Sequence, residues 1–181
     1  SVDGDTSTSD TVFLVASGAS GAAPVAEGTD AWTALSRAVE AVARSLAQQQ
    51  AADGEGANSL ITCQVSGATD DVEARALARA VVQSSLVKAA FHGRDPNWGR
   101  IADALGNAQI ADTVVLEAAG LSAEEARSRG GQRIDLDPST VRIAIAGTEV
   151  FAGLPVPFDK GAVSAAMATD EVLVRVDMGQ G

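Results

Sequence analysis

The stretch that decides the fold is FHGRDPNWGR at residues 91–100, which holds one of the two tryptophans and the only histidine. The Asp-Pro pair at residues 95–96 predicts a helix start, because the carboxylate can cap free amides and proline suits the first helical position. Apolar residues then recur at helical spacing from Trp98 to Leu105, and Gly106 stands where a C-terminal cap belongs. The residues therefore predict a packing corner in which Trp98 is a structural plug.

The composition bounds the class of protein. A chain of 181 residues can bury roughly 70% of its unfolded surface, so one domain, or one domain with a small lobe, is expected. Aromatic residues make up only 3%, so the core must form through the close approach of small side chains. The net charge of −11 argues against a nucleic-acid or anionic-membrane surface, which needs a basic footprint. This charge is compatible with an enzyme that acts on small molecules.

The single cysteine and the two ends of the chain further limit the class of protein. Cys63 is alone, so no internal disulfide can form and a secreted disulfide scaffold is excluded. No apolar run is long enough to span a bilayer, and no secretory signal opens the chain. Because the chain begins inside a polar motif and stops directly after an expected strand, we expect both ends to be cuts within a longer protein.

Strands and helices alternate along the expected elements, which predicts a mixed α/β fold. The continuous apolar run at residues 11–16 predicts a buried strand. A long helix is expected at 31–50, capped by Thr29 or Asp30, whereas residues 84–91 are ambiguous between helix and strand. The other expected elements are strand 60–65, helix 71–83 behind a capping box, a helix within 112–133 starting at Ser122, hairpin strands 141–145 and 149–151, a short helix capped by Asp159, and strand 171–176.

Several residues that could carry chemistry have simpler structural interpretations. The acidic segment at residues 3–8 resembles a calcium loop, but the sixth and twelfth positions are Thr8 and Leu14 where an EF-hand needs glycine and glutamate. His92 has no accompanying nucleophile motif or second histidine, so a partly buried structural role is expected. Cys63 lies on an apolar strand and is expected to be a buried small hydrophobe. Lys88 is expected to reach solvent or a carboxylate with its ammonium, although a lysine with a shifted pKa is the alternative.

Three separated segments resemble the ornithine acetyltransferase family, also called bifunctional glutamate N-acetyltransferases. They are VDGDTSTSDT at residues 2–11, SLVK at 85–88 and GRDPNWGRI at 93–101, and their order along the chain also fits. The resemblance covers most of residues 1–106 and, more loosely, 141–181. It divides the chain into a core part at 1–106 and a C-terminal lobe at 107–181. A segment at 112–133, containing the expected helix, looks like an insertion in that lobe.

The resemblance implies a DmpA-like fold of stacked mixed sheets between helical layers, of which this chain is part of the β chain. It implies a precursor that cuts itself and frees an N-terminal threonine as nucleophile, with an oxyanion hole supplied by the α chain. That threonine is expected upstream of Ser1, because Thr6, Thr8 and Thr11 are internal. The acetyl group would pass from N-acetylornithine to glutamate, with acetyl-CoA as a second candidate donor. The expected assembly is a cytoplasmic α2β2 heterotetramer, with no metal and no cofactor.

Glu55 is the one site residue that we select. It stands between two glycines after the long helix, where the backbone allows a ligand to approach closely. Composition alone favours an exposed loop carboxylate, but the D-x-E-G context resembles the family's substrate-contacting glutamate. A carboxylate there would hold the charged amino group of the substrate. The 2–11 segment would have a positioning role at most, and no residue of this chain is expected to be catalytic.

Two other functions remain open at the level of the sequence. A related aminopeptidase or amidase with a similar nucleophile would hydrolyse its acyl-enzyme instead of transferring the acyl group. A non-catalytic acidic α/β module could instead bind a protein partner through the 112–133 segment. The first two differ in product, acetylglutamate or acetate alone, and the third would show no turnover.

Overall fold

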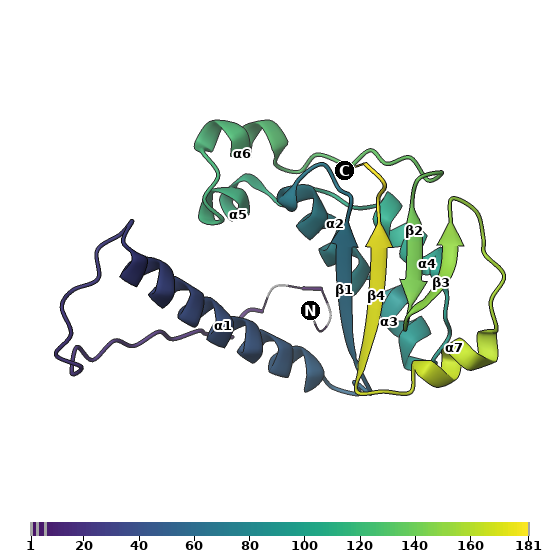
Figure 1. Ribbon diagram of the computed structural model, residues 1–181, viewed down its shortest axis with the longest axis horizontal. Helices are drawn as coiled ribbons and strands as arrows, with labels where there is room; N and C mark the ends of the chain where they lie inside the picture. Colours follow the sequence, from purple (N-terminus) through teal and green to yellow (C-terminus); the bar gives the residue numbers. More distant parts are fainter. Residues whose placement is uncertain (1, 3, 6, 181) are drawn as a thin grey trace.

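The computed structural model describes residues 2, 4, 5 and 7–180. Asp3 and Thr6 lie outside these residues, so the structure does not test the calcium-loop alternative at 3–8. The elements in chain order are α1 (Asp30–Ala52), β1 (Leu60–Ser66), α2 (Asp71–Gln83), α3 (Ser85–His92), α4 (Trp98–Gly106), α5 (Thr113–Ala118), α6 (Ala123–Arg129), β2 (Arg142–Ile145), β3 (Thr148–Ala152), α7 (Lys160–Ala166) and β4 (Glu171–Asp177) (Figure 1). Among these residues, no helix combines the length and apolarity needed to cross a membrane.

The four strands form one mixed sheet in the order β1-β4-β2-β3. β1 and β4 run parallel, with Leu60 opposite Glu171 and Ser66 opposite Asp177. β2 pairs antiparallel with both β4 and β3, and a two-residue turn joins the hairpin. The prediction of a mixed α/β fold is therefore confirmed. β1 comes from the 1–106 part and the other strands from the 107–181 part, so the two parts share one sheet.

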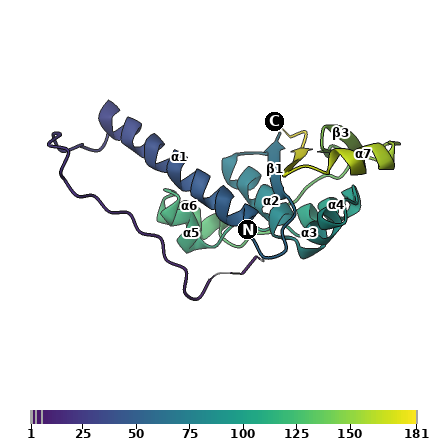
Figure 2. The ribbon, with the colours of Figure 1, turned by 90° about the horizontal axis from the view of Figure 1, so that it is seen from below.

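The core lies between one face of this sheet and the helices that cover it. Val172, Val174 and Val176 alternate along β4 and are buried, as the two-residue period of a strand requires when one face is covered. α2, α3 and α4 lie over that face (Figures 1 and 2), and α2 contributes Leu77 and Val81 to the same cluster. The segment at 84–91, ambiguous by sequence, is helical because Ser84 caps α3 by accepting from the Val87 amide.

The helix predicted at 31–50 is confirmed, but it projects away from the sheet and every residue of it is at least partly exposed (Figure 1). The buried strand predicted at 11–16 is wrong within the part of the chain that the structure describes. Residues 12–15 are extended, pair with no described strand, and expose 82–96% of their surface. An apolar run signals a tendency to be buried, but a strand also needs a neighbouring backbone, and none of β1–β4 offers one here.

The signature corner joins α3 to α4 in a way that differs from the expected cap. Asn97, not Asp95, caps α4, because its side-chain oxygen accepts from the Arg100 amide at 3.2 Å. The helix therefore begins at Trp98, and Gly106 is its last residue instead of its cap. The Asp95 carboxylate pairs with Lys160 at 2.8 Å and thereby ties the corner to α7.

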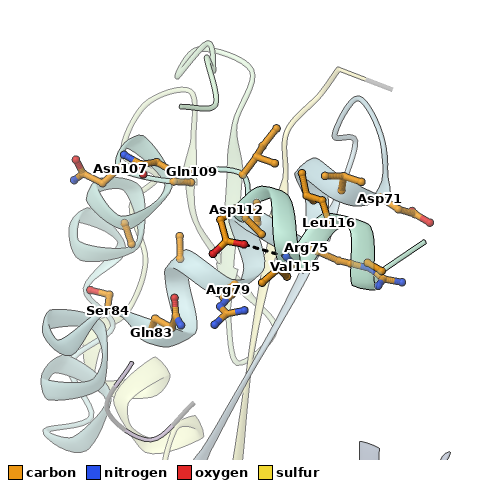
Figure 3. Close-up of a pocket in the computed structure, with 18 of the residues that line it drawn as sticks. Asp71, Arg75, Arg79, Gln83, Ser84, Asn107, Gln109, Asp112, Val115 and Leu116 are labelled. Atoms are coloured by element: carbon orange, nitrogen blue, oxygen red, sulfur yellow. Dashed lines mark hydrogen bonds between the residues drawn. The ribbon is translucent and has the colours of Figure 1, made fainter. Parts of the chain in front are cut away.

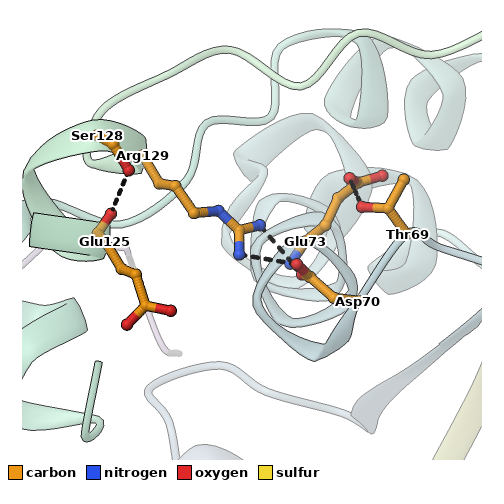
Figure 4. Close-up of polar contacts among 6 residues, drawn as sticks. All are labelled: Thr69, Asp70, Glu73, Glu125, Ser128 and Arg129. Carbon is orange, nitrogen blue, oxygen red and sulfur yellow. Dashed lines mark hydrogen bonds and ion pairs between the residues drawn. The ribbon is translucent and has the colours of Figure 1, made fainter. Parts of the chain in front are cut away.

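The 112–133 segment contains two short helices where one was expected. Asp112 caps α5, and the predicted capping box of Ser122 and Glu125 opens α6. Arg129 of α6 pairs with Asp70, the cap of α2, at 2.7 Å (Figure 4). This contact pins the α5–α6 lobe to the start of α2.

Candidate functional site

Segments far apart in the sequence converge on a cavity of about 410 Å³ beside the C-terminal end of α1. Its lining includes Val2 from the 2–11 segment, Lys88 from the SLVK segment, His92 from the tryptophan stretch, and Glu55. Two motifs of the resemblance, at 2–11 and 85–88, therefore meet at one place with the glutamate selected from the sequence, and His92 directly precedes the third motif at 93–101. No single stretch of the sequence could have indicated this meeting.

A tight turn places Glu55 in this cavity. α1 ends at Ala52, and the Ala57 amide then donates to the Gly54 carbonyl at 2.9 Å. Gly56 has a φ of +73°, which fits the third position of a type II turn, where glycine is favoured. Glu55 therefore occupies the corner of the turn, exposed and beside the cavity, where a substrate could reach it.

Lys88 lies on the wall formed by α3, and its ammonium donates to the Val2 carbonyl at 2.7 Å. Solvent or a carboxylate was expected as the partner of this ammonium, and the structure shows a backbone carbonyl of the N-terminal segment in contact with it. Lys88 and His92 are four residues apart on α3, so they share one face of the helix and both border the cavity.

His92 is exposed, which corrects the expectation of a partly buried histidine. It is the last residue of α3, and the neighbouring Phe91 takes the buried position instead. The His92 carbonyl accepts from the Asn58 amide group at 3.1 Å, so it holds the loop that follows the Glu55 turn.

Cys63 lies on β1 as a small hydrophobe that is partly buried and packs against the core, where full burial was expected. Burial raises the pKa of its thiol to about 12, because the low-polarity surroundings disfavour the thiolate. A thiolate nucleophile at this position is therefore disfavoured.

Arg44 is a cavity residue that the sequence interpretation missed. It lies on α1, borders the cavity and pairs with Glu40 one turn earlier at 3.0 Å. Gln48 and Ala51 also line the cavity, and they follow Arg44 by one and two helical turns. This helical spacing places the three residues on one face of α1, and it is the sequence signal that could have indicated Arg44.

A larger cavity of about 930 Å³ lies elsewhere, between α2, α4 and the α5–α6 lobe (Figure 3). Arg75 and Arg79 line it from α2, and Asp112, which caps α5, also lines it. It contains none of the site residues predicted from the sequence. We take the smaller cavity as the candidate site because two of the motifs and Glu55 converge there. Within residues 2, 4, 5 and 7–180, no cluster of three or more His, Cys, Asp or Glu side chains is placed to hold a metal ion.

The fold and the smaller cavity define a mixed α/β protein with a charged site of a size suited to small molecules. The profile of the ArgJ family matches residues 1–181, and the chain belongs to the ArgJ family. The arginine biosynthesis bifunctional protein ArgJ of Deinococcus radiodurans is 40% identical over 180 residues, which cover 99% of this chain and 38% of that protein. The glutamate N-acetyltransferase of Methanopyrus kandleri is 39% identical over 185 residues, covering 99% and 41%.

A solved structure agrees with the fold. The crystal structure of the arginine biosynthesis bifunctional protein ArgJ from Bacillus halodurans superposes with a TM-score of 0.80 at 32% identity, covering all of this chain and 75% of that one. The family recognised from the three motifs and the mixed α/β class are both confirmed. The chain spans about two fifths of the length of the curated relatives. Residues 112–133 lie inside the matched range, and their status as an insertion and the division at residue 106 stay predictions.

Proposed function

We propose that the intact protein containing this chain is an acetyltransferase of arginine biosynthesis that moves an acetyl group from N-acetylornithine to glutamate. Acetyl-CoA is a second candidate donor, as a bifunctional enzyme would require. Membership of the ArgJ family supports this proposal, and so do the names of relatives at about 40% identity. The single observation in the structure that supports it most is Glu55 at the cavity where two of the three motifs meet.

In the proposed reaction, the hydroxyl of an N-terminal threonine upstream of Ser1 attacks the acetyl carbonyl, and the threonine's own amine takes the proton. The bond to the ornithine nitrogen breaks, ornithine leaves with the proton, and the acetyl group stays on the threonine as an ester. The amine of glutamate then attacks that ester and frees the threonine. Backbone or side-chain donors of the α chain would stabilise the oxyanion in both steps.

The part played by this chain is to bind and orient the substrate. Glu55 offers a carboxylate at the corner of an exposed turn, and a substrate ammonium would bind it through a charge-assisted hydrogen bond. Such a contact orients the substrate without taking part in the acyl transfer.

The proposed partner is the α chain of the same precursor. Apolar side chains follow one exposed face of α1, at Trp32, Leu35, Val39, Val42 and Leu46. Residues 12–15, earlier in the chain, form an exposed apolar extended segment. A helix with an uncovered apolar stripe normally packs against a further layer, and an unpaired extended segment against another strand. We propose that the α chain supplies both, within a cytoplasmic α2β2 heterotetramer.

Expression of the full precursor tests the function. We expect the matured two-chain enzyme to form N-acetylglutamate from N-acetylornithine and glutamate, and the 181-residue chain alone to show no transfer. Release of acetate without acetylglutamate would instead indicate an aminopeptidase or amidase. The absence of turnover in the matured protein would favour a non-catalytic interaction module, and transfer by the 181-residue chain alone would refute the upstream nucleophile.

A further inference from the structure

We propose that Lys88 is a positioning residue of the site: its ammonium holds the N-terminal segment against the turn that carries Glu55. The inference rests on the proposed function for its kinetic consequences, but the contact itself is independent of it. Lys88 would act on the substrate only through Glu55, so it is not a catalytic residue.

Val2 lies between Lys88 and the Glu55 turn and contacts both. On one side the Lys88 ammonium donates to the Val2 carbonyl at 2.7 Å, which is the length of a strong charge-assisted hydrogen bond. On the other side the Val2 side chain approaches the Gly54 backbone so closely that a Cβ placed on Gly54 would lie 3.1 Å from Val2 Cγ1. Val2 is therefore packed directly against the residue that precedes Glu55.

Two other hydrogen bonds support the Glu55 turn. The Ala57 amide closes it by donating to the Gly54 carbonyl, and the Asn58 side chain holds the loop after it by donating to the His92 carbonyl. The turn follows the end of a helix that is exposed along its length. Glu55 and Gly56 are both exposed, and no atom lies within 4 Å of a Cβ placed on Gly56. The side of the turn at Gly54 is where the N-terminal segment packs, so a shift of that segment would move Glu55.

Lysine suits position 88 because its backbone belongs to a rigid helix while its ammonium reaches another segment of the chain. The neighbouring Val87 and Phe91 are buried in the core, so the backbone of α3 is fixed against the sheet. The flexible stem of Lys88 then carries the ammonium from this rigid helix to the backbone of another segment. This geometry explains why the SLVK and VDGDTSTSDT motifs occur together: one holds the backbone of the other.

The kinetic test uses the matured two-chain enzyme with Lys88→Met, which keeps the apolar stem and removes the ammonium. We expect the KM for N-acetylornithine to rise about five- to tenfold with kcat within about twofold, because a misplaced Glu55 weakens binding without altering the acyl transfer. In a Glu55→Gln background, Lys88→Met should raise KM by less than about twofold, because both substitutions weaken the same interaction, the one between Glu55 and the substrate. Independent, multiplying effects would show that Lys88 does not act through Glu55, and a loss of kcat alone would place it in the chemistry.

Two variants make the kinetic result specific to the ammonium. Lys160→Met is the matched control, because Lys160 is the other lysine of this chain and lies on α7, paired with Asp95. It should leave KM and kcat unchanged. Lys88→Cys followed by alkylation with 2-bromoethylamine restores an ammonium at similar reach and should restore the parent KM, whereas Cys63, partly buried and with a raised pKa, should resist the reagent. A KM that stays high after alkylation would contradict the proposal.

Hydrogen exchange tests the contact whether or not the enzyme transfers acetyl groups. The Ala57 amide closes the Glu55 turn, so its exchange should accelerate about tenfold or more in Lys88→Met and not in Lys160→Met. An unchanged exchange rate would overturn the positioning role. A parent enzyme that forms no N-acetylglutamate would overturn the proposed function alone, because the exchange result would still decide the role of Lys88.

Discussion

Trp98 stacks on Phe151, with ring centroids 4.9 Å apart and planes inclined by 26°. The first ring opens α4 in the signature stretch, and the second lies on β3 more than fifty positions later in the chain. The contact therefore fastens the signature corner to the edge strand of the sheet. It accounts for a tryptophan at this place without assigning it any chemistry.

Trp98→Ala should accordingly destabilise the matured enzyme. We expect a loss of about 3 kcal/mol, at the lower end of the range for buried aromatic residues because Trp98 is only partly buried. The fall in the thermal unfolding midpoint measures it. Trp98→Phe keeps a ring over Phe151 and should recover most of the loss. An unchanged midpoint combined with lost activity would make Trp98 a site residue.

Glu55→Gln should weaken substrate binding and spare turnover. The amide keeps the size of the side chain but loses the charge, so the KM for N-acetylornithine should rise by about ten- to hundredfold. Steady-state kinetics of the matured enzyme measure it, and self-cleavage of the precursor should survive because no substrate is bound at that step. Glu117→Gln, on the exposed side of α5, is the control. If kcat collapses at constant KM, Glu55 belongs to the chemistry, and if neither changes, it is only a loop carboxylate.

Ala146→Asn should stabilise the β2–β3 hairpin. Ala146 and Gly147 form its two-residue turn with φ of 48° and 85°, as a type I′ turn requires. Asparagine tolerates the left-handed conformation better than alanine, so we expect a gain of about 0.5 kcal/mol. A higher unfolding midpoint would show it, while Ala146→Val, with a branched side chain at positive φ, should lower the midpoint.

The contact between Asp70 and Arg129 should make stability depend on pH in the acid range. The hydrogen bond from Arg129, helped by the Glu73 amide, lowers the pKa of Asp70 below its usual value (Figure 4). A carboxyl whose pKa is lower in the folded state stabilises the fold above its unfolded pKa, about 3.9, and loses that contribution as the pH falls through the folded value. Stability supplied by the pair is therefore complete at neutral pH.

Asp70→Asn separates the charge from the helix cap, because asparagine caps as well as aspartate. At pH 7 we expect a loss of about 0.5–1 kcal/mol, since the pair is partly exposed. The difference from the parent in unfolding midpoint should shrink as the pH falls below about 4. Arg129→Gln should reproduce this pattern. A difference that is constant from pH 7 to pH 3 would mean that Asp70 acts only as a cap.

The sequence by itself determined the local structure and the family. The caps at Thr29, Ser122 and Asp159 were predictable because each side chain accepts a hydrogen bond from the amide three residues later, which depends on nothing beyond its own turn. The motifs indicated the ArgJ family because their residues and their order can be read directly from the sequence, without the fold. Glu55 could be selected from the same information, and its substrate contact stays a prediction.

Tertiary structure decided whatever depends on a partner far along the chain. The 11–16 run and the capping residue of α4 were predicted wrongly, because the first lacks a neighbouring strand among the described residues and Asp95 pairs with distant Lys160. The meeting of Lys88 with Val2, eighty-six positions apart, had no local signal at all. A short-range hydrogen bond depends only on residues that are neighbours in the sequence. A contact between distant segments forms only once the sheet and its helices have brought those segments together.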